Sequence, residues 1–566
     1  MPVQLSLVET AAIKVAAGPS QQVAAEPTTL QEEAAGRNRE ARRQTAESMA
    51  ARQRDISVSE FFTKNRHLLG FDNPQKALLT AVKEAVDNSL DACEEAGILP
   101  VLKVDIQQLA EDRFRIAVED NGPGIVKAQI PKIFGKLLYG SKFHTLKQAR
   151  GQQGIGISAA GMYGLLTTGK SIAVTSRTGA GRPAHYYEIQ IDTRKNLPQI
   201  ITDTVVEWEP PHGTRVEIEL VGTYKRGRHS VDDYVRQTAI ANPHSEIFYS
   251  FPGGEGTQHF PRGSESLPPE PREIKPHPHG VELGALIKMM KETSARQLSV
   301  ALQRTFSRVS QRVAQEICEA AHLKPNSNPH LIAVHEAELL YKAINSVRIM
   351  SPPTNCLSPI GEEQILSGLR KEIPASFYTA ITRAPAVYRG NPFQVEIGMA
   401  YGGDLRAEEL VDLLRFANRV PLQYQQSGCA ITKAVLSIDW RSYGLSQSKG
   451  ALPAAPLVLF VHIASVWVPF TSESKEAIAA YPEITKELRL ALQDCGRKLA
   501  GHIRAHRREV DEEKKRSYIA KYIPHIGIAL REILGFSEKV ESDLVATLKN
   551  TLERSRARDL AGNEGE

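Results

Sequence analysis

From Ser57 onward, the apolar and polar positions predict helices first and then strands. A capping serine, Ser57, precedes the aromatic-rich segment 57–71, and residues 75–98 repeat apolar side chains at helical spacing, so we expect two opening helices. Short alternating stretches then predict strands of one sheet. Helices followed by several strands indicate an α/β sandwich with helices on one face. The strand candidates are residues 101–109, 113–122, 171–178, 185–192 and 214–221.

The second half of the chain predicts a helical block and then a return to mixed structure. Residues 261–276 are dense in Pro and charge, which is typical of a linker. Helical spacing then runs to near residues 324–325, and a long polar helix is expected at 483–521, which Pro524 should end. Between these helical regions we expect a second α/β domain, with strands at 392–403, 430–440 and 456–468 and a helix at 406–419.

Length and composition set wide limits on function. The 566 residues fit about three or four domains, and the formal charge of +5 neither requires nor excludes nucleic acid. Residues 1–50 hold almost no aromatic side chain, so we expect a flexible tail. Five cysteines without a C-x-x-C pair favour a reducing, cytoplasmic interior over zinc or disulfides. The most apolar run, 456–470, is shorter than the ~20 residues of a membrane span, so no membrane partner is expected.

Four short elements carry the candidate chemistry, and the first is a helix face. Glu84 and Asn88 lie four residues apart, so both project from one side of the predicted helix. A carboxylate and an amide would then share one small volume. A solvated polar stripe explains this segment, taken alone, at least as well.

The other three elements are rich in glycine or lie next to strands. Residues 120–124 follow a strand candidate, and their glycines would let the backbone approach a flat ligand while Asp120 accepts from an exocyclic amine such as that of adenine. Residues 150–158 form a glycine-rich loop that opens a helix and suits phosphates, with Lys142 adding charge. Residues 212–214 lie just before the strand residues 215–220, where the Thr214 hydroxyl could reach a buried base. Each element alone is weak, since Asp-Asn-Gly is usually only a turn. We expect ATP binding to depend on these elements together and not on a P-loop.

In this order, the four elements resemble the Bergerat nucleotide site of the GHKL superfamily of gyrase-type topoisomerases, chaperones, sensor kinases and MutL-type repair proteins. The resemblance implies that Asn88 binds Mg²⁺, that Asp120 holds the adenine of ATP and that the lid at 150–158 holds the triphosphate. It also implies that Glu84 activates the attacking water, which is typically worth ~10²- to 10⁴-fold in rate. The ATP-binding residues it implies are Asn88, Asp120, Ser141, Lys142, Gly151, Gln152, Gln153, Gly154, Ile155, Gly156, Ile157, Ser158 and Thr214.

Longer strings narrow the resemblance to one family. The similarity to the B subunit of topoisomerase VI runs from about Ser57 to about Pro524 and is carried by residues 57–74, 139–164, 275–282 and 416–424. It implies the ATP-binding and hydrolysing subunit of a type IIB DNA topoisomerase, in which ATP-driven dimerisation gates double-strand passage to relax supercoils and decatenate DNA.

The same resemblance gives the expected fold class, α/β (α+β), and the order of domains. A flexible Ala-rich tail (1–54) should precede a GHKL ATPase domain (55–276), a helix-two-turns-helix domain (277–350), a transducer of the ribosomal-protein fold with the long helix (351–525) and a C-terminal tail (526–566).

The transducer of this family supplies a lysine that reaches the γ-phosphate of ATP, and the resemblance places Lys433 in that catalytic and ATP-binding role. A surface lysine at a strand edge is the alternative. A cation that pairs with the γ-phosphate but not with ADP would give the two nucleotide states different domain arrangements.

DNA cleavage is not expected from this chain. A Toprim-type site needs clustered carboxylates for Mg²⁺, and no Asp-x-Asp occurs in the sequence. The resemblance implies that cleavage belongs to the topoisomerase VI A subunit, a separate chain in an A₂B₂ heterotetramer, docked by the long C-terminal helix, although a solvated amphipathic helix fits that segment equally well. It also implies that the chain forms a self-dimer on ATP binding and contacts the phosphate backbone of double-stranded DNA. We therefore expect a cytoplasmic, nucleoid-associated protein.

Three other classes of protein fit the sequence less well. A sensor kinase should carry its phosphoacceptor helix before the ATP domain, whereas the suggestive string 335–338 lies after it. A non-catalytic scaffold tends to lose the site residues that this chain retains. A chaperone or a MutL-type clamp would share the ATP site but would not explain the helical insert.

Overall fold

The structure, a computed structural model, describes residues 46–53, 57–142, 145–151, 154–254, 256–472 and 474–563. The chain divides into two units, Met1–Ser57 and Val58–Glu566. The described part of the first unit includes the short helix α2 (Ala46–Ala50), and most of the tail expected at 1–54 lies outside the described residues. The elements below belong to the second unit.

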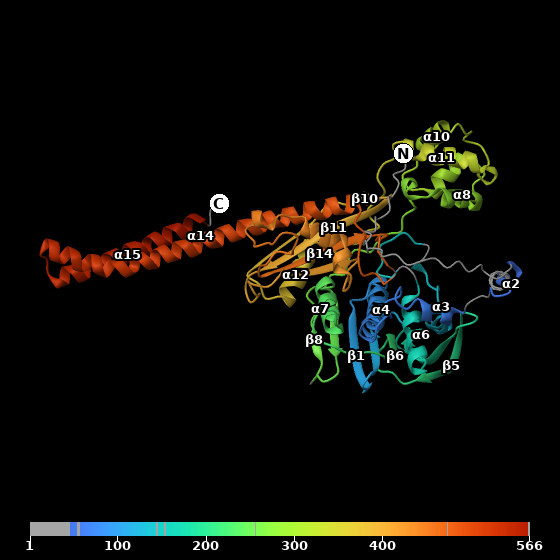
Figure 1. Ribbon diagram of the computed structural model, residues 1–566, viewed down its shortest axis with the longest axis horizontal. Helices are drawn as coiled ribbons and strands as arrows, with labels where there is room; N and C mark the ends of the chain where they lie inside the picture. The colour runs from blue at the N-terminus through green and yellow to red at the C-terminus, as the bar shows by residue number, and fades with distance from the viewer. Residues whose placement is uncertain are drawn as a thin grey trace, which may run out of the picture. The chain divides into compact units, whose positions relative to one another are not determined.

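An eight-stranded sheet begins the second unit, in the order β5-β4-β3-β6-β2-β1-β7-β8 (Figure 1). Neighbouring strands pair antiparallel except β1 and β7, which are parallel. The five expected strands are confirmed as β1, β2, β3, β4 and β6, whereas β5, β7 and β8 are additional. The edge strand β5 is mostly exposed, so its sequence lacks the buried alternation that predicts a strand. The strands are β1 (Val101–Ala110), β2 (Arg113–Asp120), β3 (Ile172–Arg177), β4 (Ala184–Asp192), β5 (Leu197–Val206), β6 (Gly213–Val221), β7 (Glu246–Ser250) and β8 (Gln258–Phe260).

Helices cover one face of this sheet, as expected (Figure 1). Helix α4 packs on β2 and helix α6 on β6, and together they close the core. The start of α4 follows from its sequence, because the Asn73 side chain accepts from Lys76 N at 2.8 Å and Pro74 occupies the first turn. The helices are α3 (Val58–Lys64), α4 (Pro74–Glu95), α5 (Ile130–Gly135), α6 (Gly156–Thr168) and α7 (Val231–Ala241), with the 3₁₀ turn η1 (Lys127–Gln129).

A helical module with its own apolar core follows. Leu286, Leu302, Ile317 and Leu340, one from each of four helices, are buried in that core. The fourth helix lies beyond residues 324–325, so the helical block is longer than the spacing indicated. The helices are α8 (Leu283–Glu292), α9 (Leu298–Thr305), α10 (Gln311–Ala320) and α11 (Val334–Ser346), with the 3₁₀ turns η3 (Pro278–Gly280) and η4 (Pro329–Leu331).

A second sheet follows the module, in the order β10-β11-β14-β12-β13, with β9 also paired to β11. Strand β14 is central and buried throughout, which explains why it forms the most apolar run of the chain. Phe460 joins the core under α12, whereas its neighbour Leu459 joins the core under α13 and α14. The elements are α12 (Glu362–Glu372), β9 (Phe377–Thr382), β10 (Ala386–Tyr388), β11 (Asn391–Tyr401), β12 (Asp412–Ala417), β13 (Val420–Pro421), η5 (Gln426–Gly428), α13 (Ala430–Leu436), η6 (Trp440–Tyr443) and β14 (Leu457–Ser465).

Two predictions in this region were wrong. The helix expected at 406–419 contains strand β12, and the strand expected at 430–440 begins with helix α13. Strand β12 pairs in parallel with β14, and this ladder satisfies its buried backbone, so tertiary pairing outweighs the helical spacing. In α13, Ile431 and Val435 are both buried and lie four residues apart. This spacing fits one face of a helix as well as it fits the alternating apolar positions of a strand.

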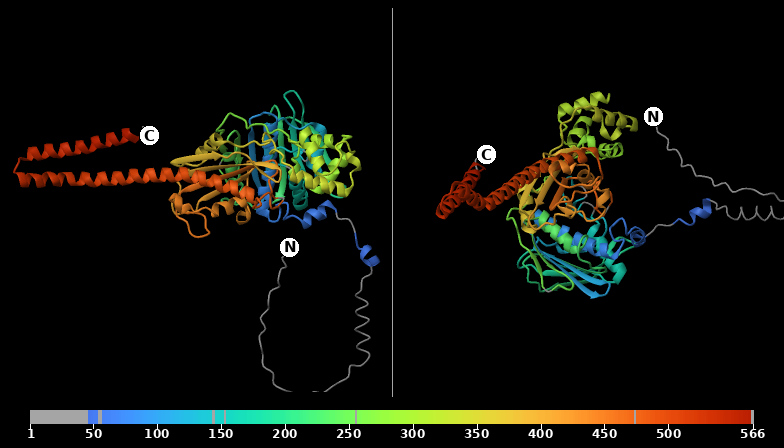
Figure 2. Two further views of the ribbon diagram at one scale, coloured as in Figure 1. Left: turned by 90° about the horizontal axis from the view of Figure 1, so that it is seen from above. Right: turned by 60° about the vertical axis from the view of Figure 1, so that its left-hand side comes forward.

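The long helix α14 (Pro482–Leu534) contains Pro524, so the stop expected there was wrong. Helix α15 (Glu538–Asn563) packs back along α14 (Figure 2). The two helices approach closely at Gly527, where an added Cβ would lie 2.6 Å from Val545 Cγ2. A proline inside a helix costs about 3 kcal/mol, and we infer that this packing offsets part of that cost. The expected C-terminal tail is therefore helical as far as Asn563.

The five cysteines are free and buried. Within the described residues, no helix has the length and apolarity needed to cross a bilayer, and no three His, Cys, Asp or Glu side chains gather as a metal centre.

Candidate functional site

A cavity of about 630 Å³ lies between helix α4, the end of β2 and the start of α6. Most of the expected ATP-binding residues line it, and two residues of the loop after β14, Ser474 and Lys475, line it as well. The expected residues in its wall are Glu84, Asn88, Asp120, Ser141, Lys142, Gly151, Gly154, Ile155, Gly156, Ile157 and Thr214.

The helix face of the site projects from α4. Most of this helix is buried, but Glu84 is half-buried and Asn88 is exposed, because both open onto the cavity. A Cβ added at Gly156 would overlap the Glu84 carboxylate, so this carboxylate lies directly against the first turn of α6. The Asn88 amide oxygen lies 3.8 Å from where a Cβ of Gly151 would be, so it faces the lid. The expected carboxylate and amide therefore share one volume beside the glycine loop.

Asp120 ends strand β2 and is 7% exposed. Its Oδ1 accepts from Gly122 N at 2.9 Å and from Thr214 N at 3.2 Å, and its Oδ2 accepts from Ser89 Oγ at 2.9 Å. Burial raises the pKa of Asp120 to about 6, although these hydrogen bonds favour the ionised form. The second lone pair of Oδ2 remains available to a ligand donor.

Glycines let the backbone close around Asp120. At Gly124 (φ +70°) a Cβ would overlap the carbonyl oxygen of Arg177, and at Gly213 (φ +136°) it would overlap that of Asp120. The Thr214 hydroxyl lies 3.0 Å from Ser176 Oγ, which fixes its position in the cavity wall. The sequence pattern identified these turns, and the structure shows that their function is close packing of the strand ends.

The glycine lid leads into α6, whose first turn presents backbone N–H groups without partners inside the helix. Ser158 does not line the cavity, because its hydroxyl donates to Ile133 O at 2.9 Å and to Lys136 O at 3.1 Å. Gln152 and Gln153 lie outside the described residues. The lid therefore offers backbone donors in place of the Ser158 hydroxyl.

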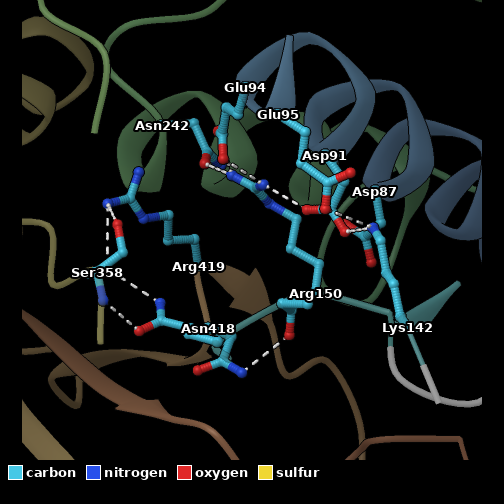
Figure 3. Close-up of polar contacts among 12 residues, drawn as sticks. Asp87, Asp91, Glu94, Glu95, Lys142, Arg150, Asn242, Ser358, Asn418 and Arg419 are labelled. Carbon is cyan, nitrogen blue, oxygen red and sulfur yellow. Dashed lines mark hydrogen bonds and ion pairs between the residues drawn. The ribbon is translucent and has the colours of Figure 1, made fainter. Parts of the chain in front are cut away.

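A buried ion-pair cluster lies behind the lid (Figure 3). The Arg150 guanidinium donates to Asp91 Oδ1 at 2.8 Å and to the Glu94 carboxylate at 2.6 and 2.8 Å. Burial opposes ionisation of Glu94, but Arg150 and His244 hold its pKa below the usual range. Lys142 Nζ also donates to Asp91, so the charge expected to contact phosphate is paired with a carboxylate at the cavity wall.

The expected transducer lysine, Lys433, is exposed on α13 and does not line the cavity. Lys475 lines it instead; this residue is 7% exposed, has φ +53° and donates from Nζ to Arg150 O at 3.2 Å. The next residue, Glu476, pairs with Lys76 at the start of α4 and anchors the loop. Lys475 lies in an irregular loop with no local signature, so sequence reasoning missed it.

One string of the chain, Gly164–Ser171, fits the P-loop consensus G-x-x-x-x-G-K-S. A P-loop connects a strand to the helix that follows it. Here the order is reversed, since Gly164 lies inside α6, Gly169 ends that helix with φ +72° and β3 comes next. None of these residues lines the cavity, so the string is a helix C-cap and not a phosphate loop.

The comparisons with known proteins agree with this geometry. Residues 73–222 match a family model described as "Histidine kinase-, DNA gyrase B-, and HSP90-like ATPase", and residues 352–515 match "Topoisomerase VI B subunit, transducer". The ATPase region of Saccharomyces cerevisiae topoisomerase II aligns with 80% of this chain and 99% of its own, at 12% identity and a TM-score of 0.37, a likeness too low to carry a conclusion.

Two curated relatives are much closer in sequence. The B subunit of type 2 DNA topoisomerase 6 from Methanosarcina barkeri is 50% identical over 490 residues, covering 86% of this chain and 79% of the relative. The protein of the same name from Archaeoglobus fulgidus is 48% identical over 498 residues, covering 88% and 82%. The chain therefore belongs to the family of type 2 DNA topoisomerase 6 B subunits and is an ATP-hydrolysing subunit of a type II DNA topoisomerase.

Proposed function

We propose that the cavity binds ATP with Mg²⁺ and hydrolyses it. The observation that carries this proposal is the convergence of Glu84, Asn88 and Asp120 with the glycine lid on one cavity. Adenine would lie against the free lone pair of Asp120, near the Thr214 hydroxyl. The triphosphate would lie at the start of α6, where helix N–H groups and the positive helix end favour anions.

The residues present fit a magnesium ion. Mg²⁺ prefers oxygen ligands and usually keeps substrate phosphates and waters around one or two protein oxygens. Asn88 offers an amide oxygen that faces the lid, and a bound Mg²⁺ would neutralise charge on the phosphates. Glu84, beside the first turn of α6, is placed to accept a proton from an attacking water.

We assign the transducer cation to Lys475 in place of Lys433. Lys475 lines the cavity and is held there by the anchored neighbour Glu476, whereas Lys433 is exposed on α13. A lysine that pairs with the γ-phosphate would lose that partner on hydrolysis, so ATP and ADP would favour different positions of the loop after β14.

Beyond the site, we propose that the chain works in an A₂B₂ assembly with a separate A subunit that cleaves DNA and docks on α14 and α15. The names of the relatives, each a B subunit, support a partner. The two matched family models fall within the proposed ATPase (55–276) and transducer (351–525) domains, and helices α8 to α11 fall within the proposed helix-two-turns-helix domain (277–350). ATP binding would dimerise the chain around double-stranded DNA held through its phosphates, at the nucleoid.

Binding and turnover of ATP by the full chain test the site. We expect Glu84→Ala to bind ATP with Mg²⁺ like wild type and to hydrolyse it ~10²- to 10⁴-fold more slowly. Asn88→Ala should lose the part of ATP affinity that depends on Mg²⁺. A matched control is Glu119→Ala, because Glu119 precedes Asp120 on β2 but pairs with Lys103 away from the cavity. Hydrolysis by Glu84→Ala at the wild-type rate would contradict the assignment.

A further inference from the structure

The segment Gln148–Arg150 leads into the glycine lid and is held by the transducer along its whole length. Gln148 N donates to Cys356 O at 3.0 Å. The Gln148 side-chain amide exchanges two hydrogen bonds with the backbone of Ser358, accepting from its N at 2.7 Å and donating to its O at 3.0 Å. All three contacts lie in buried or partly buried surroundings, where hydrogen bonds are costly to break.

The next two carbonyls of the segment accept from two further transducer side chains. Asn418 Nδ2 donates to Ala149 O at 2.9 Å, and Lys475 Nζ donates to Arg150 O at 3.2 Å. Three consecutive residues thus meet three separate transducer segments. The contact from Asn418 is distinct from the lysine contact, because Asn418 does not line the cavity and binds Ala149, the residue just before the lid.

The Arg150 side chain points the opposite way, into the ATPase domain (Figure 3). It binds Asp91 and Glu94 of α4 and donates to Asn242 Oδ1 at 2.6 Å. Its burial with two carboxylates fixes it to the helix that also carries Glu84 and Asn88. The segment therefore joins the helix face of the site to the transducer.

Asn418 is itself rigidly placed. Asn418 (φ +48°) and Arg419 (φ +68°) form the two-residue turn between β12 and β13, and positive φ at both positions is the pattern of a type I′ turn. The Asn418 amide exchanges two hydrogen bonds of 2.9 Å with the backbone of Ser465, at the end of the central strand β14. Arg419 N donates to His462 Nε2 of the same strand at 2.9 Å. The turn is therefore bonded directly to the central strand of the transducer sheet.

We propose that Asn418 is a positioning residue that couples the nucleotide lid to the transducer sheet through Ala149 O. This inference rests on the proposed function of the cavity as the ATP site. When nucleotide binds at the start of α6, the segment 148–150 moves with it, and the Asn418 contact carries that shift to β12, β13 and β14. Lys475 responds to the nucleotide, whereas Asn418 responds to the lid.

The variant Asn418→Gly removes this contact together with the two side-chain hydrogen bonds to Ser465. Glycine adopts positive φ without strain, so the turn keeps its backbone conformation while the side-chain donor to Ala149 O is removed. Asn418→Asp is a second variant, since it keeps the acceptor for Ser465 N but has no donor. The matched control is Arg389→Gly in the turn between β10 and β11, where Arg389 (φ +43°) stacks only on Tyr388 and Tyr481 among the described rings.

Hydrogen exchange of the full chain, with and without Mg²⁺ and a non-hydrolysable ATP analogue, tests the coupling. In wild type and Arg389→Gly we expect the analogue to slow exchange both around the lid and in residues 412–421 and 457–465. In Asn418→Gly the protection around the lid should persist, while the analogue-dependent protection in the transducer falls by about two- to thirty-fold. This is the typical range of the change in coupling caused by a single mutation between two coupled sites.

Each remaining outcome overturns one claim. If Asn418→Gly shows the wild-type response in the transducer, the coupling role is wrong and the ATP site stands. If wild type shows no protection around the cavity, the ATP site itself is wrong. A second measurement is the ATP consumed per strand-passage event with the A subunit present: Asn418→Gly and Asn418→Asp should raise this ratio, a change that mere loss of folded protein would not produce. An unchanged ratio in both variants would also overturn the coupling.

Discussion

Replacing Asp120 by asparagine should weaken ATP binding while stabilising the protein. The asparagine Oδ1 can keep the bonds from Gly122 N and Thr214 N, and its Nδ2 can donate to Ser89 Oγ. The amide would then present a donor to the adenine amine, where the carboxylate presents an acceptor. Loss of a hydrogen bond to a charged group costs about 1.5–3 kcal/mol, or roughly 10- to 150-fold in Kd.

The pH dependence separates Asp120 from other groups. Because burial raises its pKa to about 6, one pH unit below that value should leave roughly a tenth of the carboxylate ionised and weaken binding about tenfold. The γ-phosphate of ATP also titrates near pH ~6, so wild type and Asp120→Asn must be compared at each pH. The extra loss of affinity in wild type below pH 6 should be absent from the variant.

The same pKa fixes the sign of the stability change. Folding raises the pKa of Asp120 from 3.8 to about 6. The contribution of this carboxyl to the free energy of unfolding is therefore highest below pH 3.8 and falls as the pH rises through about 6. Without nucleotide, Asp120→Asn should therefore be more stable than wild type at pH 7.5, by up to about 3 kcal/mol, with a smaller gain at pH 5. Isothermal titration and urea unfolding measure both effects, with Asp105→Asn on β1 as the control. Unchanged ATP affinity at pH 7.5, or a pH slope retained in the variant, would refute the reasoning.

Three further changes test other parts of the site. Gly156→Ala should displace the Glu84 carboxylate and slow hydrolysis by at least ~10²-fold, with ATP affinity changed only a few-fold; single-turnover hydrolysis measures this, and wild-type turnover would contradict it. Lys475→Ala should reduce both ATP hydrolysis and the difference in affinity between ATP and ADP, whereas Lys433→Ala should leave both near wild type. The reverse result in paired titrations would assign the γ-phosphate contact to Lys433. Arg150→Met leaves the buried Asp91 and the partly buried Glu94 without this cation and should cost about 3–5 kcal/mol at pH 7. The cost should be smaller at pH 5, because the carboxylates can then bind protons. A loss under about 1 kcal/mol in urea unfolding would contradict the ion-pair account.

The parts of the site that the sequence predicts are those fixed by local spacing. Glu84 and Asn88 share a helix face because they are four residues apart, and Asp120 ends a strand whose alternation is readable. The glycine lid also carries a local signal, since positive φ and close approach restrict the residue type. Each of these features depends on only a few neighbouring residues.

The parts that the sequence does not predict depend on distant segments. Lys475 is held at the cavity by the bond from its Nζ to Arg150 O and by the ion pair of its neighbour Glu476 with Lys76, residues that lie hundreds of positions earlier in the chain. Strand β12 is set by its pairing with β14, and its own apolar spacing would equally suit a helix. Pro524 lies within α14, which packs against α15, a helix that comes later in the chain. In each case long-range packing outweighs a local preference.

The most direct test of the central claim is plasmid relaxation by this chain co-expressed with its cognate A subunit, in ATP and Mg²⁺, comparing wild type with Glu84→Ala. The account predicts relaxation that requires both proteins and ATP, with multiple turnover lost in Glu84→Ala although the variant still binds ATP. Sustained relaxation by Glu84→Ala, or a wild type that binds ATP and dimerises but never changes DNA topology with the A subunit, would contradict it.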